Sequence, residues 1–174
     1  MANFLVSLRR AKLYKTMKKI ITILILTCAV MSVNKVNAQA NGSSYNTSVG
    51  IKGYFGDGSI GGINVRHNLS SANAVEGGIY FKSHYVMLEG LYEWQGDINN
   101  APGLKWYAGP GAQLGFYSFH GHSDVAFALK GAIGLDYKFA GAPIDVAFDL
   151  NPTFTLTPDS DFSLYAGLAF RFAF

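Results

Sequence analysis

The sequence has one cysteine, Cys28, and no acidic residue in its first 38 positions. Cys28 lies inside an apolar run, so the chain after residue 38 has no cysteine, which excludes disulfides and thiol chemistry there. A lipoprotein role for Cys28 would need a small residue just before it, and Thr27 stands there instead. After residue 40 there is also no long apolar run and no sustained 3.6-residue periodicity, which argues against membrane-spanning or bundled helices.

Charge is distributed unevenly along the 174 residues. Residues 1–38 hold seven of the 14 basic residues, which leaves seven basic and eleven acidic residues in the remainder, a net charge near −4. The overall charge of +3 therefore gives no support to nucleic-acid binding, and we expect no nucleic-acid partner.

The first 38 residues have the parts of a secretory signal peptide. A short basic stretch, "MKK" at 17–19, precedes an apolar segment at 20–33, and "VNA" at 36–38 suits cleavage before Gln39. We therefore predict a cleaved signal peptide over residues 1–38, in which residues 1–16 precede the true start or lengthen the basic region. One domain is predicted over residues 39–174.

Apolar and polar residues alternate with a period of two through this domain, which is typical of β-strands with two different faces. Eight segments show the alternation, at residues 47–56, 60–69, 75–83, 85–95, 104–117, 124–139, 144–156 and 162–174. The breaks are rich in Gly, Pro, Asn, Asp and Ser, except near residues 82–85, where the turn signal is weak. The predicted fold is all-β, an eight-stranded antiparallel up-and-down barrel.

The two faces of these strands differ in chemistry. One carries large aliphatic and aromatic residues and no formal charge, whereas the other holds all seven basic residues of the domain and many glycines and alanines. A soluble barrel would turn the apolar face inward, and a transmembrane barrel would turn it outward. Small residues beside long charged ones suit a narrow lumen better than a solvated surface, so the pattern favours the transmembrane barrel.

Energetics also place the charges inside if the barrel spans a membrane. One Lys or Arg facing lipid costs roughly 2–4 kcal/mol at mid-bilayer, so several would exceed the stability of a domain, about 5–15 kcal/mol. The predicted lumen charge network comprises Lys52, Arg66, Glu76, Lys82, Glu89, Glu93, Lys105, Lys130, Asp136, Lys138, Asp145, Asp149 and Arg171. Eight strands leave an interior just wide enough for side chains, so we expect salt bridges that plug the lumen. A narrow ion path is the alternative.

Several segments carry a family resemblance: "AVEGGIYF" (74–81), "LEGLYEW" (88–94), "GLKWYAGPGAQLGFY" (103–117), "GAIGLDYKFAGAPIDVAFDLNPTFTL" (131–156) and the closing "GLAFRFAF" (167–174). In this order they resemble the small outer-membrane β-barrel proteins of Bacteroidetes-type bacteria, and more distantly the transmembrane part of OmpA-type proteins. The resemblance implies an eight-stranded outer-membrane barrel and supplies no catalytic residue or cofactor. The terminal aromatics Phe170, Phe172 and Phe174 resemble the signal by which the outer-membrane assembly machinery recognises its substrates.

Three residue groups suggest chemistry, and each has a simpler interpretation. His120, His122 and Asp124 have the types and spacing of a partial metal site, but a polar loop is favoured. Glu89 and Glu93 share a strand face, as paired catalytic carboxylates would, but ion pairing is favoured because seven cations share that face. A lipase-like triad would need His67 close to a serine and an acid such as Glu76, and the spacing is unspecific.

The sequence thus predicts a non-enzymatic protein of the bacterial outer membrane with a structural or surface-interaction role. A small pore or solute transporter is the alternative, and a lipid-modifying enzyme is a third class. The expected partners are outer-membrane lipid, lipopolysaccharide and the assembly machinery, and the expected state is a monomer without cofactor.

Overall fold

The computed structural model describes residues 45–56, 58–119 and 122–174, and every regular element in these ranges is a β-strand. The strands are β1 (Thr47–Gly56), β2 (Gly58–Asn68), β3 (Asn73–Lys82), β4 (Tyr85–Asp97), β5 (Leu104–Phe119), β6 (His122–Lys138), β7 (Ile144–Thr157) and β8 (Asp161–Ala173). The predicted signal peptide lies outside the described residues. Within them, no helix has the length and apolar character needed to cross a membrane.

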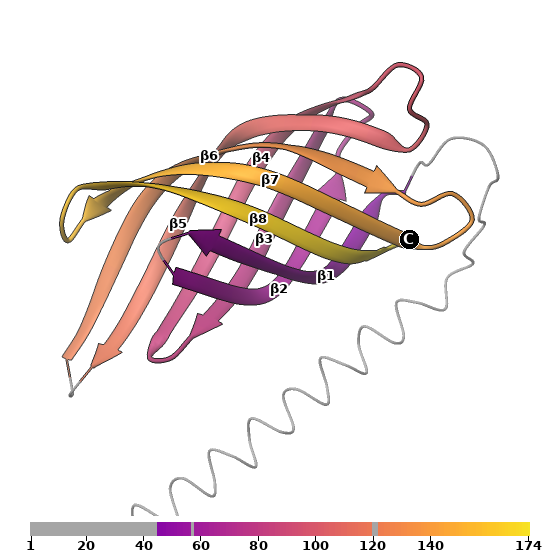
Figure 1. Cartoon of the computed structure of the whole chain (residues 1–174). Coiled ribbons are helices and arrows are strands. Elements are labelled where there is room, and N and C mark those ends of the chain that lie inside the picture. Colours follow the sequence, from indigo (N-terminus) through magenta and orange to yellow (C-terminus); the bar gives the residue numbers. More distant parts are fainter. Residues whose placement is uncertain (1–44, 57, 120–121) are drawn as a thin grey trace, which may run out of the picture. The chain divides into compact units, whose positions relative to one another are not determined.

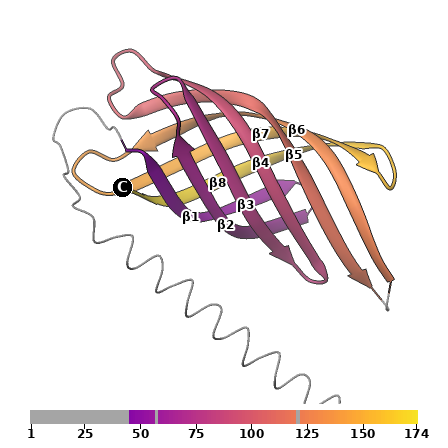
Figure 2. The same ribbon diagram turned by 180° about the vertical axis from the view of Figure 1, so that it is seen from behind.

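The eight strands form one closed barrel in which each strand pairs antiparallel with the next (Figures 1 and 2). Closure comes from β1 and β8, which pair antiparallel from Ser48 opposite Ala173 to Phe55 opposite Ala166. The last residue continues this seam, because Thr47 and Phe174 exchange backbone hydrogen bonds of 3.0 and 2.8 Å. The predicted fold class is confirmed, and each strand begins and ends within two residues of its predicted bounds.

The alternation of side chains across the wall gives the barrel an apolar exterior and a polar interior. Ile51 and Ile133, which face outward, are 66% and 61% exposed. The largest fully buried side chains are instead Arg66 and Arg171, each with no exposed surface. This arrangement is the reverse of a soluble protein, in which Arg and Lys are almost never fully buried.

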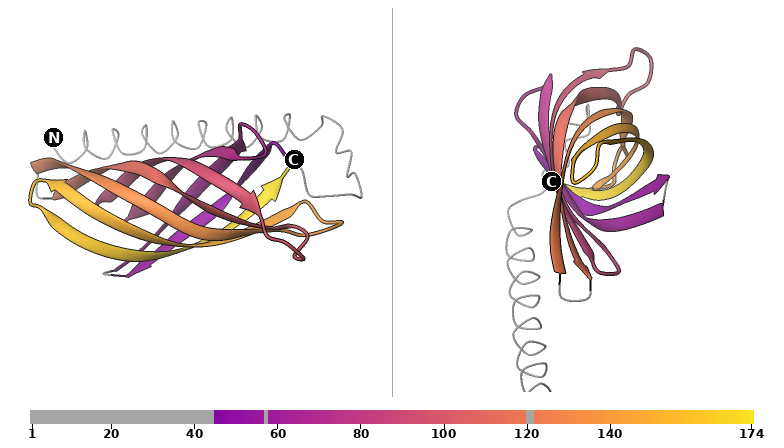
Figure 3. Two further views of the ribbon diagram at one scale, coloured as in Figure 1. Left: turned by 90° about the horizontal axis from the view of Figure 1, so that it is seen from above. Right: turned by 90° about the vertical axis from the view of Figure 1, so that its left-hand side faces the viewer.

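The barrel has two distinct ends. The terminal end carries Tyr45, Phe174 and the turns at residues 69–72, 98–103 and 139–143, while the opposite end, here called the hairpin end, carries the turns at 83–84 and 158–160. Figure 3 shows the strands coiling about the barrel axis between these ends. Exposed aromatic side chains pack in pairs at the terminal end, including Tyr92 with Trp94 and Tyr137 with Phe139.

The connection with the weak turn signal is a two-residue hairpin between β3 and β4. Lys82 pairs with Tyr85, and His84 has a φ of 59°. This left-handed conformation is uncommon outside glycine, although His adopts it more often than most residues do. The turn was therefore hard to recognise from composition, because no Gly, Asn or Asp marks it.

Candidate functional site

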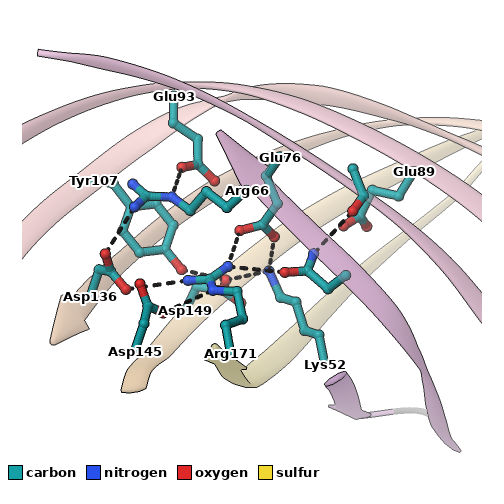
Figure 4. Close-up of polar contacts among 12 residues, drawn as sticks. Lys52, Arg66, Glu76, Glu89, Glu93, Tyr107, Asp136, Asp145, Asp149 and Arg171 are labelled. Atoms are coloured by element: carbon teal, nitrogen blue, oxygen red, sulfur yellow. Dashed lines mark hydrogen bonds and ion pairs between the residues drawn. The ribbon is translucent and has the colours of Figure 1, made fainter. Parts of the chain in front are cut away.

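Among the described residues, ten charged side chains are buried in the lumen, where ion pairs and hydrogen bonds through Asn64 and Tyr80 join them into one network (Figure 4). They come from every strand except β5, which adds the hydroxyl of Tyr107. The ten are Lys52, Arg66, Glu76, Glu89, Glu93, Lys130, Asp136, Asp145, Asp149 and Arg171. Apart from Arg171 with Asp145 of the adjacent β7, the ion pairs join strands that are not neighbours, so these contacts cross the lumen.

Arg171 of β8 is the most heavily shared cation. Its guanidinium meets Asp145 of β7 at 2.8 Å, Glu76 of β3 at 2.7 Å and Asp136 of β6 at 3.2 Å. Nη1 also donates to Oδ1 of Asn64 at 3.0 Å. The planar fork of arginine suits such multiple charge-assisted bonds, which a lysine could not reproduce.

Arg66 of β2 makes the second such set. Its Nε lies 2.8 Å from Glu93 and its Nη1 lies 2.8 Å from Asp136, so Asp136 is shared by both arginines. Nη2 donates to the amide oxygen of Gln95 at 2.8 Å. Tyr45, just before β1, completes this layer, because its hydroxyl accepts from Arg66 at 3.0 Å and contacts both Asp136 and Asp145.

Two lysines extend the network towards the hairpin end. Lys52 bonds Glu76 at 2.6 Å and Asp149 at 2.7 Å, and Tyr107 donates to the same Asp149 at 2.6 Å. Lys130 bonds Glu89 at 2.6 Å and donates to the hydroxyl of Tyr54 at 3.0 Å.

Glu89 accepts further hydrogen bonds in this part of the network. The hydroxyl of Tyr54 donates to it at 2.5 Å and the amide of Gln113 at 2.8 Å. The Lys52 and Lys130 ammonium groups lie 5.1 and 4.3 Å from the Tyr54 ring centroid. Tyr54 therefore links Lys52 to the pair of Lys130 and Glu89.

The network contains more acid than base. Six carboxylates face four cations among the ten buried residues, a formal excess of two negative charges. One carboxylate oxygen, Oε1 of Glu93, is buried without a hydrogen-bond partner among the described residues. Buried charges are tolerated only when they are paired, so each of the four cations supports more than one acidic side chain or hydroxyl here.

Three lysines predicted for the network are not part of it. Lys82 ends β3 and is exposed, while Lys105, near the start of β5, meets the exposed Asp97 at 3.6 Å. Lys138 ends β6 and donates to the backbone oxygens of Phe139 and Ala142. All three lysines occupy alternating strand positions that face the lumen. At a strand end, however, the long side chain reaches water and needs no buried partner.

The two glutamates and the histidine considered for catalysis have other partners. Glu89 and Glu93 bind different cations, Lys130 and Arg66. His67 is exposed and bonds Thr47 at 2.8 Å, whereas Glu76 is inside, so this pair cannot serve one triad.

The metal candidates are only partly described. His120 lies outside the described residues, as does the side chain of His122, while Asp124 is exposed. Among the described residues, no group of three His, Cys, Asp or Glu side chains is placed to hold a metal ion.

Several uncharged members of the site were missed by sequence reasoning. Tyr54, Tyr80, Tyr107, Asn64 and Asn151 share the inward parity of the charged residues, so the alternation itself was a signal for them. Tyr45 carried no such signal. It precedes β1, and only barrel closure brings its hydroxyl to Asp136.

Comparison with known proteins identifies the architecture. The N-terminal β-barrel domain of Pseudomonas aeruginosa OprF superposes with a TM-score of 0.57 at 18% identity, covering 77% of this chain and 100% of that domain. The chain has the fold of the OprF barrel. Neisserial surface protein A is also similar, with a TM-score of 0.49 at 14% identity, covering 77% of this chain and 99% of that protein. No family profile and no curated protein sequence matches the chain.

Proposed function

We propose that this chain is a monomeric outer-membrane β-barrel whose lumen is plugged by the charge network, and that its role is structural or in surface interaction rather than enzymatic. The observation that carries the proposal is the inverted distribution of side chains. In the part of the chain that the structure describes, 32 large hydrophobic side chains are exposed, while ten charged side chains are buried. Only a hydrocarbon solvent makes this distribution favourable, since outward apolar and inward polar residues are the signature of membrane barrels.

The outer membrane is the bilayer that suits this fold. A closed barrel leaves no unpaired strand edge, so neighbouring strands of the wall bond to each other without water. The predicted signal peptide would deliver such a chain across the inner membrane. Outer-membrane lipid and lipopolysaccharide are then the natural partners of the apolar wall, and the likeness to Bacteroidetes-type barrels remains a prediction.

The packing of the lumen supports a plug over a pore. Arg66, Arg171 and Glu93 have no exposed surface, so no water reaches them. Their contacts join β2 to β6 and β8 to β3 and so span the lumen. An ion would have to break several charge-assisted bonds to pass.

Both halves of the proposal can be tested on the wild-type protein. We expect the purified protein to need detergent for solubility and to migrate differently in a gel with and without boiling. After reconstitution into a planar bilayer it should show no steady conductance. A protein that is soluble and monomeric without detergent would refute the membrane barrel, and a steady conductance would favour the small pore.

The end of β8 provides a prediction about assembly. Phe170, Phe172 and Phe174 are 52%, 45% and 42% exposed on the outer face, as a recognition signal for the assembly machinery requires. Phe174→Ala keeps the backbone bonds of Phe174 with Thr47 and removes only the ring. We expect several-fold less folded barrel in cells but unchanged refolding of purified protein.

The control is Phe162→Ala, which removes an equally outward ring at the other end of β8, 64% exposed. We expect it to assemble normally. If the two variants reach the membrane in equal amounts, the terminal aromatic is not a signal.

A further inference from the structure

The lumen is not filled along its whole length. At the hairpin end there is a cavity of about 530 Å³, here called the vestibule, which lies above the layer of Tyr54, Lys130 and Glu89. Its volume falls in the range of small-molecule sites, about 300–1,000 Å³. Tyr54 and Gln113, which both bond Glu89, line this open chamber, whereas none of the ten charged network residues does.

The vestibule is hollow because its wall residues are small and its aromatic rings lie flat. A Cβ on Gly115 would collide with the Tyr85 hydroxyl, and one on Gly56 would stand 2.8 Å from the Tyr165 ring. Each ring thus covers a glycine of the neighbouring strand instead of projecting into the lumen. Tyr85 also stacks on Tyr117, with centroids 4.4 Å apart.

These rings favour a flat, apolar ligand body. Four tyrosines line the vestibule, together with Met87 and several small residues; the tyrosines are Tyr54, Tyr85, Tyr117 and Tyr165. Aromatic faces and edges pack well against a planar ring in offset or edge-to-face geometry. The phenol hydroxyls and Gln113 add a few hydrogen-bonding groups, as small-molecule sites do.

The charge of the residues that line the vestibule determines whether an anionic or a cationic ligand is favoured. Among the described residues that line the vestibule, Lys82 is the one with a formal charge, and no carboxylate is present. Its ammonium lies at the mouth, 2.7 Å from where a Cβ on Gly58 would stand. Tyrosine cages can bind quaternary ammonium groups, but here such a cation would meet Lys82, and Asp124, the carboxylate that lines a neighbouring pocket with Lys82, lies outside the described lining of the vestibule.

We infer that the vestibule binds a small aromatic carboxylate, with its ring among the tyrosines and its carboxylate towards Lys82 at the mouth. This site gives Lys82, which takes no part in the charge network, a role of its own. It also explains why the inward positions of β5 and β6 near the hairpin end are small, namely Gly115, Ala126 and Ala128. The inference depends on the geometry of the barrel interior and goes beyond the proposed structural role.

The test uses the full barrel in lipid nanodiscs and three probes with the same phenylpropenyl skeleton, titrated by calorimetry against empty nanodiscs. The probes are cinnamate, cinnamyl alcohol and cinnamyltrimethylammonium, which are anionic, neutral and cationic. We expect cinnamate to bind with a dissociation constant of roughly 0.1–1 mM, as its size allows. The alcohol should bind several-fold more weakly and the cation most weakly.

Two substitutions locate the site. Lys82→Gln should weaken cinnamate about threefold to tenfold and leave the alcohol unchanged, the scale of a partly exposed charge pair. Lys105→Gln, at the terminal end, is its control and should have no effect. Ala126→Phe should fill the vestibule and abolish binding of both probes, whereas Val125→Phe, which faces outward, should not.

Each variant is first checked for heat-modifiable migration. The inference is overturned if no probe binds, if the three probes bind equally, or if cinnamate affinity is unchanged in Lys82→Gln. Since Lys82 is exposed and outside the network, that last variant tests the site even if Ala126→Phe fails to fold.

Discussion

Replacing Arg171 by methionine should lower the free energy of unfolding by about 3–5 kcal/mol, the cost of removing one partner from a buried ion pair. Arg171 contacts Glu76, Asp136 and Asp145 and has no exposed surface. Methionine fills a similar volume, so the loss reports charge and hydrogen bonding rather than a cavity. Urea titration of the protein in lipid vesicles, followed by tryptophan fluorescence, measures it.

The matched control is Glu93→Gln, which removes a charge of the opposite sign from the same network. The network already has two more carboxylates than cations, and Oε1 of Glu93 has no hydrogen-bond partner among the described residues. We therefore expect Glu93→Gln to cost less than about 1 kcal/mol, since the amide oxygen can still accept from Arg66. Equal losses in the two variants would mean that the excess of acid has no energetic consequence.

Ile51→Lys should destabilise the barrel in a bilayer by about 2–4 kcal/mol, the cost of a lysine that faces lipid near the midplane. Ile51 is 66% exposed and lies halfway along β1, paired with Ile63 and Phe170. The same substitution on a water-exposed surface would cost almost nothing. Unfolding from vesicles is again the measurement.

Leu69→Lys is the companion variant, because Leu69 is 55% exposed just beyond the end of β2. The cost of a lipid-facing lysine falls to about 0–1 kcal/mol near the membrane interface. A difference between the two positions would show that the exterior is solvated by lipid with a defined depth. If both substitutions were harmless, the apolar wall would not face a bilayer.

Strand number, strand bounds and facing were all predictable from the alternation of residue types. Away from bulges the side-chain period in a barrel wall is two, so the alternation alone assigns Arg66, Asp149 and Arg171 to the lumen. The alternation is less informative at strand ends. Lys82 and Lys138 occupy lumen-facing positions there, but their side chains lie beside water. The alternation also could not predict Tyr45, because that residue belongs to no strand.

Pairing within the lumen could not be predicted from the sequence. Parity places Arg171 and Glu76 on the same side of the wall, but only the stagger of the closed barrel brings β8 and β3 into contact across it. The vestibule depends on the tertiary structure in the same way. Its hollow requires Tyr85 to lie over Gly115 of the neighbouring strand, a contact set by strand register.

The sequence by itself therefore determined that the chain forms eight strands with an apolar and a charged face, because local alternation and turn chemistry are sufficient for that. Barrel closure decided which charges meet, which lysines remain in water and where the lumen stays open. These outcomes depend on distances between strands remote in sequence, and those distances exist only once β1 has paired with β8.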